Sequence, residues 1–239
     1  GRISPRSARR GIFIDELLSG DELVTEVFTI TEGQLTPVIS QDMSHNPDDL
    51  EEGGEDLSDF PTLYEQTYRS NTASSSESPA APVCADINND NIIEIPTAQP
   101  MPGYEEQDEI IYLTEYHQLQ EEQLNRVFAA AFNRDAGYLV KFPEEWVGNV
   151  TVVNQIENGE WRFITYNPNQ KNPLEDLSGE LARVRVVNQN SYQDKFLESY
   201  VQLCEPRGVF NYYGYVPENP VSTLAITVDQ LKNELFSLL

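Results

Sequence analysis

The residues of this chain with the clearest chemical potential form one acidic loop, 86–94, of sequence Asp-Ile-Asn-Asn-Asp-Asn-Ile-Ile-Glu. Oxygen-bearing side chains stand at its first, third, fifth and ninth positions, which are Asp86, Asn88, Asp90 and Glu94. A hard cation such as Ca²⁺ takes about six to eight oxygen ligands, and alternate positions of a tight loop direct their oxygens inward. Ile92 would add its backbone carbonyl, and Glu94 would close the site with its carboxylate. The pattern therefore predicts a single calcium site.

The residues that follow this loop indicate which kind of calcium loop it is. A helical EF-hand needs a glutamate at position 12, where this chain has Thr97 directly after Pro96. The apolar segment 92–95 favours a strand instead of an exiting helix. Asn91 stands where a left-handed backbone is needed, and asparagine tolerates that conformation. The alternative is an Asx-rich turn that binds no ion.

The charge of the chain excludes whole classes of partner. Its 239 residues carry a formal net charge of −25, so we expect neither nucleic acid nor anionic lipid as a partner. Such acidity suits a solvated extracellular protein or one that binds cations. No stretch is apolar for long enough to form a membrane helix, so we expect no direct membrane insertion. The start at Gly1, without Met, predicts a fragment of a longer chain, with a disordered basic linker over 1–10.

Residues suited to catalysis are scarce. The two histidines are His45 and His117, and the sequence has no zinc spacing, nucleophile elbow or phosphate-binding glycine loop. Cys84 and Cys204 form a long-range disulfide or stay as free thiols, with free thiols favoured. Adjacent carboxylates such as Glu144-Glu145 are frequent among 40 acidic residues. We therefore predict no catalytic residues, and a hydrolase that uses a carboxylate pair is the alternative.

The first half of the chain predicts β-hairpins. Alternating apolar residues and turn signals over Gly11–Ile39 predict an antiparallel meander with a turn at Glu32-Gly33. We expect a short strand at 64–69, a surface loop at 41–59 and a flexible connection at 71–82. This region, 11–113, is expected to form one β-hairpin domain that carries the acidic loop.

The second half, 114–239, predicts an α+β domain. Propensity favours a helix over 115–132, yet the apolar residues at 110–113 and a hairpin at 133–137 favour strands, which we adopt. Asn158-Gly159 predicts another hairpin. Further strands are expected at 181–188 and 209–216, and a helix at 192–203. A last helix is expected to be capped by Thr227 with Gln230 and to present one apolar face, made of Val228, Leu231, Leu235 and Leu238.

Two short segments resemble known families. The loop at 86–94 resembles the integrin-type, FG-GAP propeller calcium loop, Asp-x-Asp-x-Asp-Gly-x-x-Asp, and departs from it at Asn88, Asn91 and Glu94. The segment 137–146, Gly-Tyr-Leu-Val-Lys-Phe-Pro-Glu-Glu-Trp, resembles a Tyr-x-x-x-Phe-Pro-x-x-Trp segment of Firmicutes surface lipoproteins and the opening of the PsbP-like sandwich. These resemblances imply an extracytoplasmic binding or scaffold module with degenerate blade-like hairpins.

Together these patterns predict a β-rich α+β fold: antiparallel hairpins, degenerate and blade-like, followed by an antiparallel sheet with one or two packed helices. Trp146 and Trp161 are expected in its core, whereas Tyr212, Tyr213 and Tyr215 stay open as core or binding residues. The predicted function is a non-enzymatic module of a bacterial surface protein, extracellular or anchored, stabilised by Ca²⁺. Its partner would be a surface ligand, either protein or glycan.

Overall fold

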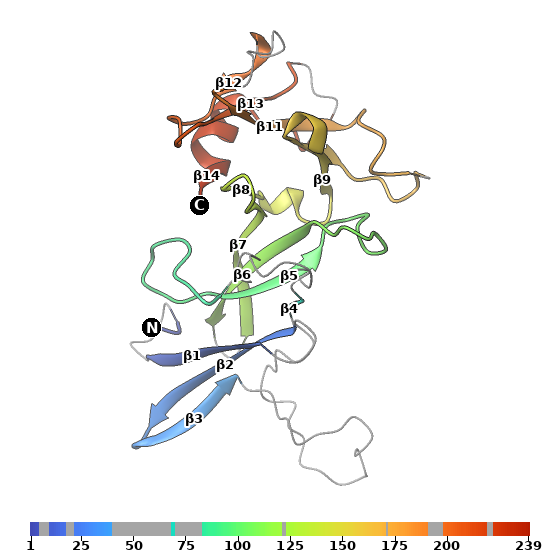
Figure 1. Ribbon diagram of the computed structural model, residues 1–239. Helices are drawn as coiled ribbons and strands as arrows, with labels where there is room; N and C mark the ends of the chain where they lie inside the picture. The colour runs from blue at the N-terminus through green and yellow to red at the C-terminus, as the bar shows by residue number, and fades with distance from the viewer. Residues whose placement is uncertain are drawn as a thin grey trace. The chain divides into compact units, whose positions relative to one another are not determined.

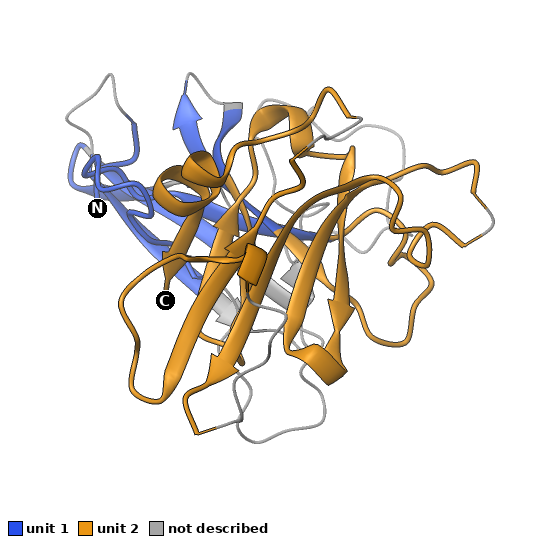
Figure 2. Ribbon diagram, turned by 90° about the horizontal axis from the view of Figure 1, so that it is seen from above, with its two compact units in different colours: residues 1–99, 114–128 blue, residues 100–113, 129–239 orange. Residues whose placement is uncertain are grey.

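The structure, a computed structural model of the chain, describes residues 1–4, 10–17, 22–39, 68–69, 83–120, 123–170, 172–190, 198–218 and 222–239. They divide into two compact units (Figure 2): unit 1 is 1–99 with 114–128, and unit 2 is 100–113 with 129–239. The loop expected at 41–59 and the connection expected at 71–82 lie outside the described residues.

Unit 1 contains the predicted meander. Strands β1 (Gly11–Leu17), β2 (Glu22–Thr31) and β3 (Gln34–Ile39) pair antiparallel in the order β1-β2-β3, and β4 (Tyr68–Arg69) pairs with β2 (Figure 1). The β2–β3 turn has positive φ at Glu32 (53°) and Gly33 (81°), as a two-residue type I′ turn requires. The meander and its turn are therefore confirmed.

The start of the chain belongs to unit 1 rather than to a linker. Ile3 is buried among the core residues Val27, Ile95 and Leu119. The N–H of Gly11 donates to the carbonyl of Gly1 at 2.9 Å. Residues 1–4 therefore do not form the predicted linker, because the side chain of Ile3 and backbone hydrogen bonds hold them in unit 1. Residues 5–9 lie outside the described residues.

A second sheet confirms the strand prediction for 110–134. It has the order β14-β8-β7-β6-β5, with β5 (Ile95–Pro100), β6 (Tyr112–Gln120), β7 (Gln123–Asn133), β8 (Tyr138–Lys141) and β14 (Phe236–Leu238). Three consecutive alanines of β7, residues 129–131, are all buried, so this part of the strand is covered on both faces. Tertiary burial therefore overrides helix propensity. The strand expected at 92–95 begins only at Ile95, because the residues before it close the acidic loop.

Unit 2 contains a third antiparallel sheet of order β12-β13-β11-β10-β9. Its strands are β9 (Val150–Gln155), β10 (Glu160–Thr165), β11 (Glu180–Asn188), β12 (Val201–Gln202) and β13 (Phe210–Tyr215). The predicted Asn158-Gly159 hairpin is confirmed, although a short 3₁₀ turn, η5 (Ile156–Asn158), precedes the left-handed Gly159. The helix prediction for 192–203 is wrong at residues 201–202, which form β12 and pair with β13. Residues 191–197 lie outside the described residues.

An aromatic core holds unit 2 together. The ring of Tyr138 packs against those of Trp161, Tyr212 and Phe236. Trp146, in the 3₁₀ turn η4 (Glu144–Trp146), is 1% exposed and its indole N–H donates to the carbonyl of Leu224 at 2.8 Å. The prediction of both tryptophans as core is confirmed, and Tyr212 joins them.

The C-terminal helix is shorter than the sequence predicts. Thr227 and Gln230 form the predicted capping box at the start of α1 (Val228–Gln230), which continues as one π turn, η7 (Leu231–Leu235). Phe236–Leu238 then pair with β8, so Leu238 does not extend the helix face. Gly214 explains the close packing here, because a Cβ on it would lie 2.9 Å from Leu231 Cδ2. The described residues thus form a β-rich fold of three antiparallel sheets with one short α-helix.

The aromatic core gives a first prediction. Phe163 is fully buried against Phe142 and Trp146, so Phe163→Ala should lower the free energy of unfolding by about 3–5 kcal/mol in urea titrations. Ile156→Ala is the matched control, because Ile156 is exposed in the same unit and its loss should change stability by about 0.5 kcal/mol at most. Equal losses in both variants would contradict this core.

Candidate metal centre

The acidic loop is closed by its own backbone. Ala85 and Glu94 form an isolated antiparallel bridge, with reciprocal N–H···O distances of 3.2 and 2.9 Å. Asn89 and Asn91 have left-handed φ values of 62° and 67°, so the left-handed position predicted for Asn91 is confirmed. Asparagine is one of the few non-glycine residues that adopt this conformation at low cost. The loop therefore turns back sharply between two fixed ends.

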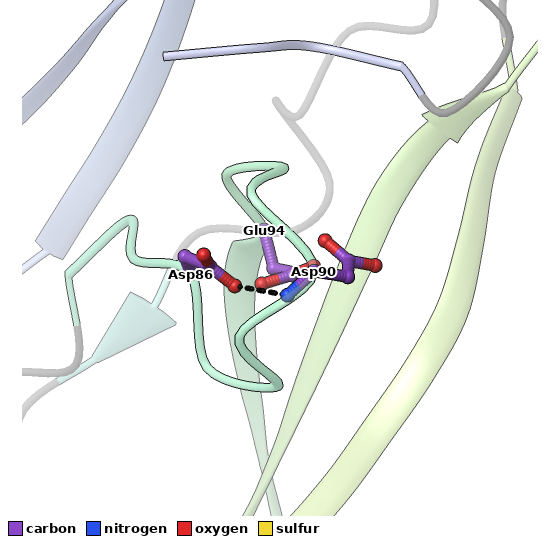
Figure 3. A group of neighbouring side chains, drawn as sticks. All are labelled: Asp86, Asp90 and Glu94. Carbon is purple, nitrogen blue, oxygen red and sulfur yellow. Dashed lines mark hydrogen bonds between the residues drawn. The ribbon is translucent and has the colours of Figure 1, made fainter.

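Three carboxylates meet in this loop (Figure 3). One oxygen each from Asp86, Asp90 and Glu94 lies within 4.8 Å of the others. Calcium binds oxygens at about 2.3–2.6 Å, so ligands on opposite sides of the ion lie about 5 Å apart. Glu94 is 0% exposed, Asp86 is half-buried and Asp90 is exposed. The spacing and chemistry of these oxygens fit a divalent cation.

The two aspartates organise the loop backbone. Asp86 accepts the N–H of Asp90 on Oδ1 at 3.0 Å, and that of Asn91 on Oδ2 at 2.9 Å. Asp90 Oδ1 accepts the N–H of Ile92 at 2.8 Å. Asn88 Oδ1 also accepts from the Asp90 N–H at 3.0 Å, and its amide donates to Asp90 Oδ2 at 3.2 Å. These hydrogen bonds connect four of the five predicted ligand residues: Asp86, Asn88, Asp90 and Ile92. Ile92 takes part through its backbone N–H, and its side chain is buried.

Gln118 completes the site from strand β6. Its Nε2 donates to Asp90 Oδ2 at 2.6 Å and to Glu94 Oε1 at 2.7 Å, and the side chain is 3% exposed. Glu94 Oε2 accepts the N–H of Ile87 at 2.9 Å. Sequence reasoning missed Gln118. Its only local signal is a polar side chain two residues from the buried Tyr116 on the same face of a strand.

The pKa values of Glu94 and Asp90 are shifted in opposite directions. Burial raises the pKa of Glu94, and the charges of Asp90 and Asp86 raise it further, against hydrogen bonds from Gln118 and Ile87. Burial also raises the pKa of Asp90, but hydrogen bonds from Gln118, Ile92 and Asn88 with the charge of Arg2 outweigh it and lower the pKa. The ionised Glu94 is therefore the group that a cation would stabilise most.

The hydrogen bonds leave capacity for an ion. An ionised carboxylate offers about four lone-pair positions, more than any of these three side chains uses in the contacts above. A cation next to Glu94 would oppose both causes of its raised pKa, desolvation of the charge and repulsion by its neighbours. The donor set is all oxygen, which suits hard cations such as Ca²⁺ and Mg²⁺.

The two cysteines and the two histidines are the other residues whose side chains could do chemistry. Cys84 and Cys204 are free thiols. Burial, the charge of Asp15 and a hydrogen bond to it raise the pKa of the Cys84 thiol strongly, and Cys84 Sγ donates to Asp15 Oδ1 at 3.2 Å. In His117 burial disfavours the charged imidazolium and so lowers the pKa, although the charge of Glu115 acts in the opposite direction. His45 lies outside the described residues.

The raised pKa of Glu94 predicts how stability depends on pH in the presence of a chelator. Because the folded pKa exceeds its ordinary value of 4.5, this group contributes stability below pH 4.5 that is lost as pH rises through the folded pKa. Glu94→Gln should remove that decline, as measured by urea unfolding in EGTA over a pH series. The control is Glu106→Gln, an exposed carboxylate outside the loop, which should keep the wild-type profile.

Parallel profiles for the wild type and Glu94→Gln would contradict the raised pKa. Raising the calcium concentration should itself flatten the wild-type decline, because the cation stabilises the ionised form.

In the part of the chain that the structure describes, no helix is long and apolar enough to span a membrane. Comparison of the chain with protein-family models, with curated proteins and with solved structures finds no match.

Proposed function

We propose that this chain is a non-enzymatic extracytoplasmic binding or scaffold module whose unit 1 is stabilised by one Ca²⁺ in the loop Asp86–Glu94. The observation that carries the proposal is the convergence of three carboxylates within 4.8 Å, one of them fully buried. Burying an ionised carboxylate is costly unless it is paired or binds a metal. A divalent ion supplies the missing positive charge.

The position of the loop gives the ion a structural role. The loop is bridged to its own start at Ala85, and the N–H of Ile93 donates to the carbonyl of Arg2 at 3.0 Å. Gln118 ties it to strand β6. An ion bound to the loop would thus hold three separate segments of unit 1 in place. Metal binding of this kind adds directly to the folding free energy.

Unit 1 is the part of the chain that would gain most from such support. Its described hydrophobic cluster contains Ile3, Val27, Ile95 and Leu119 as buried members, whereas the cluster of unit 2 is several times larger. Small cores supply little stability, and natural small domains add disulfides or metals. Both cysteines are free thiols, so a bound metal, and not a disulfide, would provide this stabilisation.

The ligand chemistry favours calcium over other ions. The cluster offers carboxylate oxygens, while Cys84 is engaged with Asp15 and is not part of it. Zinc prefers nitrogen and sulfur, and magnesium demands a near-ideal octahedron that a loop with fixed internal hydrogen bonds provides poorly. Weak calcium loops, with dissociation constants of about 10⁻⁴–10⁻³ M, are typical of extracellular modules. The net charge of −25 and the resemblance to surface lipoproteins support the same location.

The alternative, a hydrolase with a carboxylate pair, receives less support from this cluster. Every carboxylate oxygen of Asp86, Asp90 and Glu94 accepts a hydrogen bond from the loop backbone or from the amides of Asn88 and Gln118. A general acid needs one carboxyl that holds a transferable proton and faces its substrate. Carboxylates fixed in this way are suited to holding an ion.

Calcium removal tests the proposal. EGTA should lower the melting temperature and speed hydrogen exchange at the amides of Asp90, Asn91 and Ile92, because the ion no longer holds the loop. At a free calcium concentration of about 100 times the dissociation constant the stabilisation should be about 2.7 kcal/mol. Amides of strands β10 and β11 in unit 2 serve as the internal reference and should not respond.

Variants separate a bound ion from a general effect of salt. Asp86→Ala should abolish the response to EGTA, whereas Asp108→Ala, which removes an exposed acid in unit 2, should retain it. Magnesium at the same concentration should restore less of the melting temperature than calcium. A melting temperature indifferent to the chelator, or a response that survives Asp86→Ala, would falsify the calcium site.

A further inference from the structure

Unit 2 carries a second polar site that shares no residue with the acidic loop. It is a pocket of about 930 Å³ on the sheet that contains β10, β11 and β13. Trp161, Phe163 and Val184 turn to the core. Because side chains of a strand alternate between faces, Arg162 and Arg183 stand on the opposite face and line the pocket.

The strand register places cationic and aromatic side chains in a row across this face. Arg162 pairs with Arg183, and Arg183 pairs with Tyr215. In the adjacent row Glu160 pairs with Arg185. Two like charges directly opposite each other destabilise a sheet. In a chain with only 15 Lys and Arg residues, three arginines line this pocket together with three glutamates, so an anionic ligand depends on an arginine that keeps free donors.

Arg183 is held in a fixed orientation. Its guanidinium forms a two-point ion pair with Glu180, with Nη2 at 2.9 Å from Oε2, and its Nη1 donates to the hydroxyl of Tyr200 at 3.3 Å. It also lies over the ring of Tyr215, 4.8 Å from the centroid. The rings of Tyr200 and Tyr215 are 5.5 Å apart. Arg183 therefore positions an aromatic wall.

Arg162 has guanidinium N–H groups that could donate hydrogen bonds to a ligand. Its Nε donates to Glu160 Oε1 at 2.7 Å, while the hydroxyl of Tyr200 donates to Glu160 Oε2. Glu160 is 2% exposed, so this pair fixes the stem of Arg162. Among the described residues, Nη1 and Nη2 of Arg162 have no hydrogen-bond acceptor from the protein. These two nitrogens form the planar fork that binds a carboxylate at two points.

We propose that this pocket binds a sugar that carries a carboxylate. The fork of Arg162 would take the carboxylate, and the rings of Tyr200 and Tyr215 would cover an apolar face of the sugar. Asn158 and Ser199, which also line the pocket, provide partners for hydroxyl groups. Ligand pockets measure about 300–1,000 Å³, and a volume near 930 Å³ accommodates one or two sugar rings.

The surrounding charge selects a monoanion. Glu157, Glu160 and Glu218 line the same pocket, and the chain as a whole carries −25. Repulsion grows in proportion to the ligand charge, so a phosphate dianion or a polyanion meets more of it than a single carboxylate. The neutral body of a hydroxylated ring can approach these glutamates as a hydrogen-bond donor. The carboxylate is therefore favoured over phosphate.

Calorimetric titration with glucuronate tests the proposal, with glucose and inorganic phosphate as the comparison ligands. Glucuronate should bind, and glucose, which lacks the carboxylate, should bind at least about tenfold more weakly, because a bidentate charged contact is lost. Arg162→Gln should weaken glucuronate binding by a similar factor. Arg162→Lys keeps the charge beside Glu160 but removes the planar fork. This variant should therefore fold, but it should bind glucuronate more weakly than the wild type does.

Arg134→Gln is the matched control, since it removes an arginine of unit 2 that does not line the pocket, and it should bind as the wild type does. Titration in calcium and in EGTA should give the same affinity, so failure of the calcium proposal and failure of this one are distinguishable. Absence of glucuronate binding at tens of millimolar, an unchanged affinity in Arg162→Gln, or phosphate binding as tightly as glucuronate would each overturn the proposal.

Discussion

The hydrogen bonds from Gln118 to Asp90 and Glu94 are the contacts on which the organisation of unit 1 depends most. They place the amide nitrogen of a buried strand residue between two carboxylates, at 2.6 and 2.7 Å. An amide is neutral and offers only the partial positive charge of its N–H groups, so it reduces the repulsion between the two acids without cancelling it. Burial of the charge, and then the repulsion that remains, raises the pKa of Glu94. A cation in the loop would oppose both of these causes.

The local part of this site could be predicted from the sequence, and the distant part could not. The spacing of Asp86, Asn88, Asp90 and Glu94 within nine residues defines a loop whose oxygens converge, because short-range geometry follows from turn chemistry. Gln118 is 24 residues beyond Glu94, and only the pairing of strands brings it to the loop. Single-sequence patterns contain no information on that pairing. Arg162 and Arg183 were missed for the same reason, and Tyr215 was left open as a core or binding residue, since the three meet across three strands.

The secondary structure shows the same division between local and tertiary control. Turns with strong chemistry, such as Glu32-Gly33 and Asn158-Gly159, formed where the sequence places them. The segment 115–132 has helical propensity but lies mostly in strands β6 and β7, because burial of Ala129–Ala131 on both faces outweighs a propensity worth only tenths of a kcal/mol per residue. At the C-terminus the capping box set the start of the helix correctly. Its end was set by pairing with β8, which no local rule predicts.

The distribution of charge connects the two proposed sites. A chain of net charge −25 disfavours any anion, so an anion site requires local cations that are held rigidly enough to outweigh the general repulsion. The structure provides this by fixing Arg183 with Glu180 and Tyr200, and Arg162 with the buried Glu160. In the acidic loop the hydrogen bonds described above come from neutral backbone and amide N–H groups, and the charge of Arg2 acts on Asp90, so a divalent ion from solution would add to this compensation. The pocket thus has arginines in its own sheet, while the loop presents three carboxylates. For this reason the two units would respond to different solutes, one to a divalent metal and the other to a carboxylate.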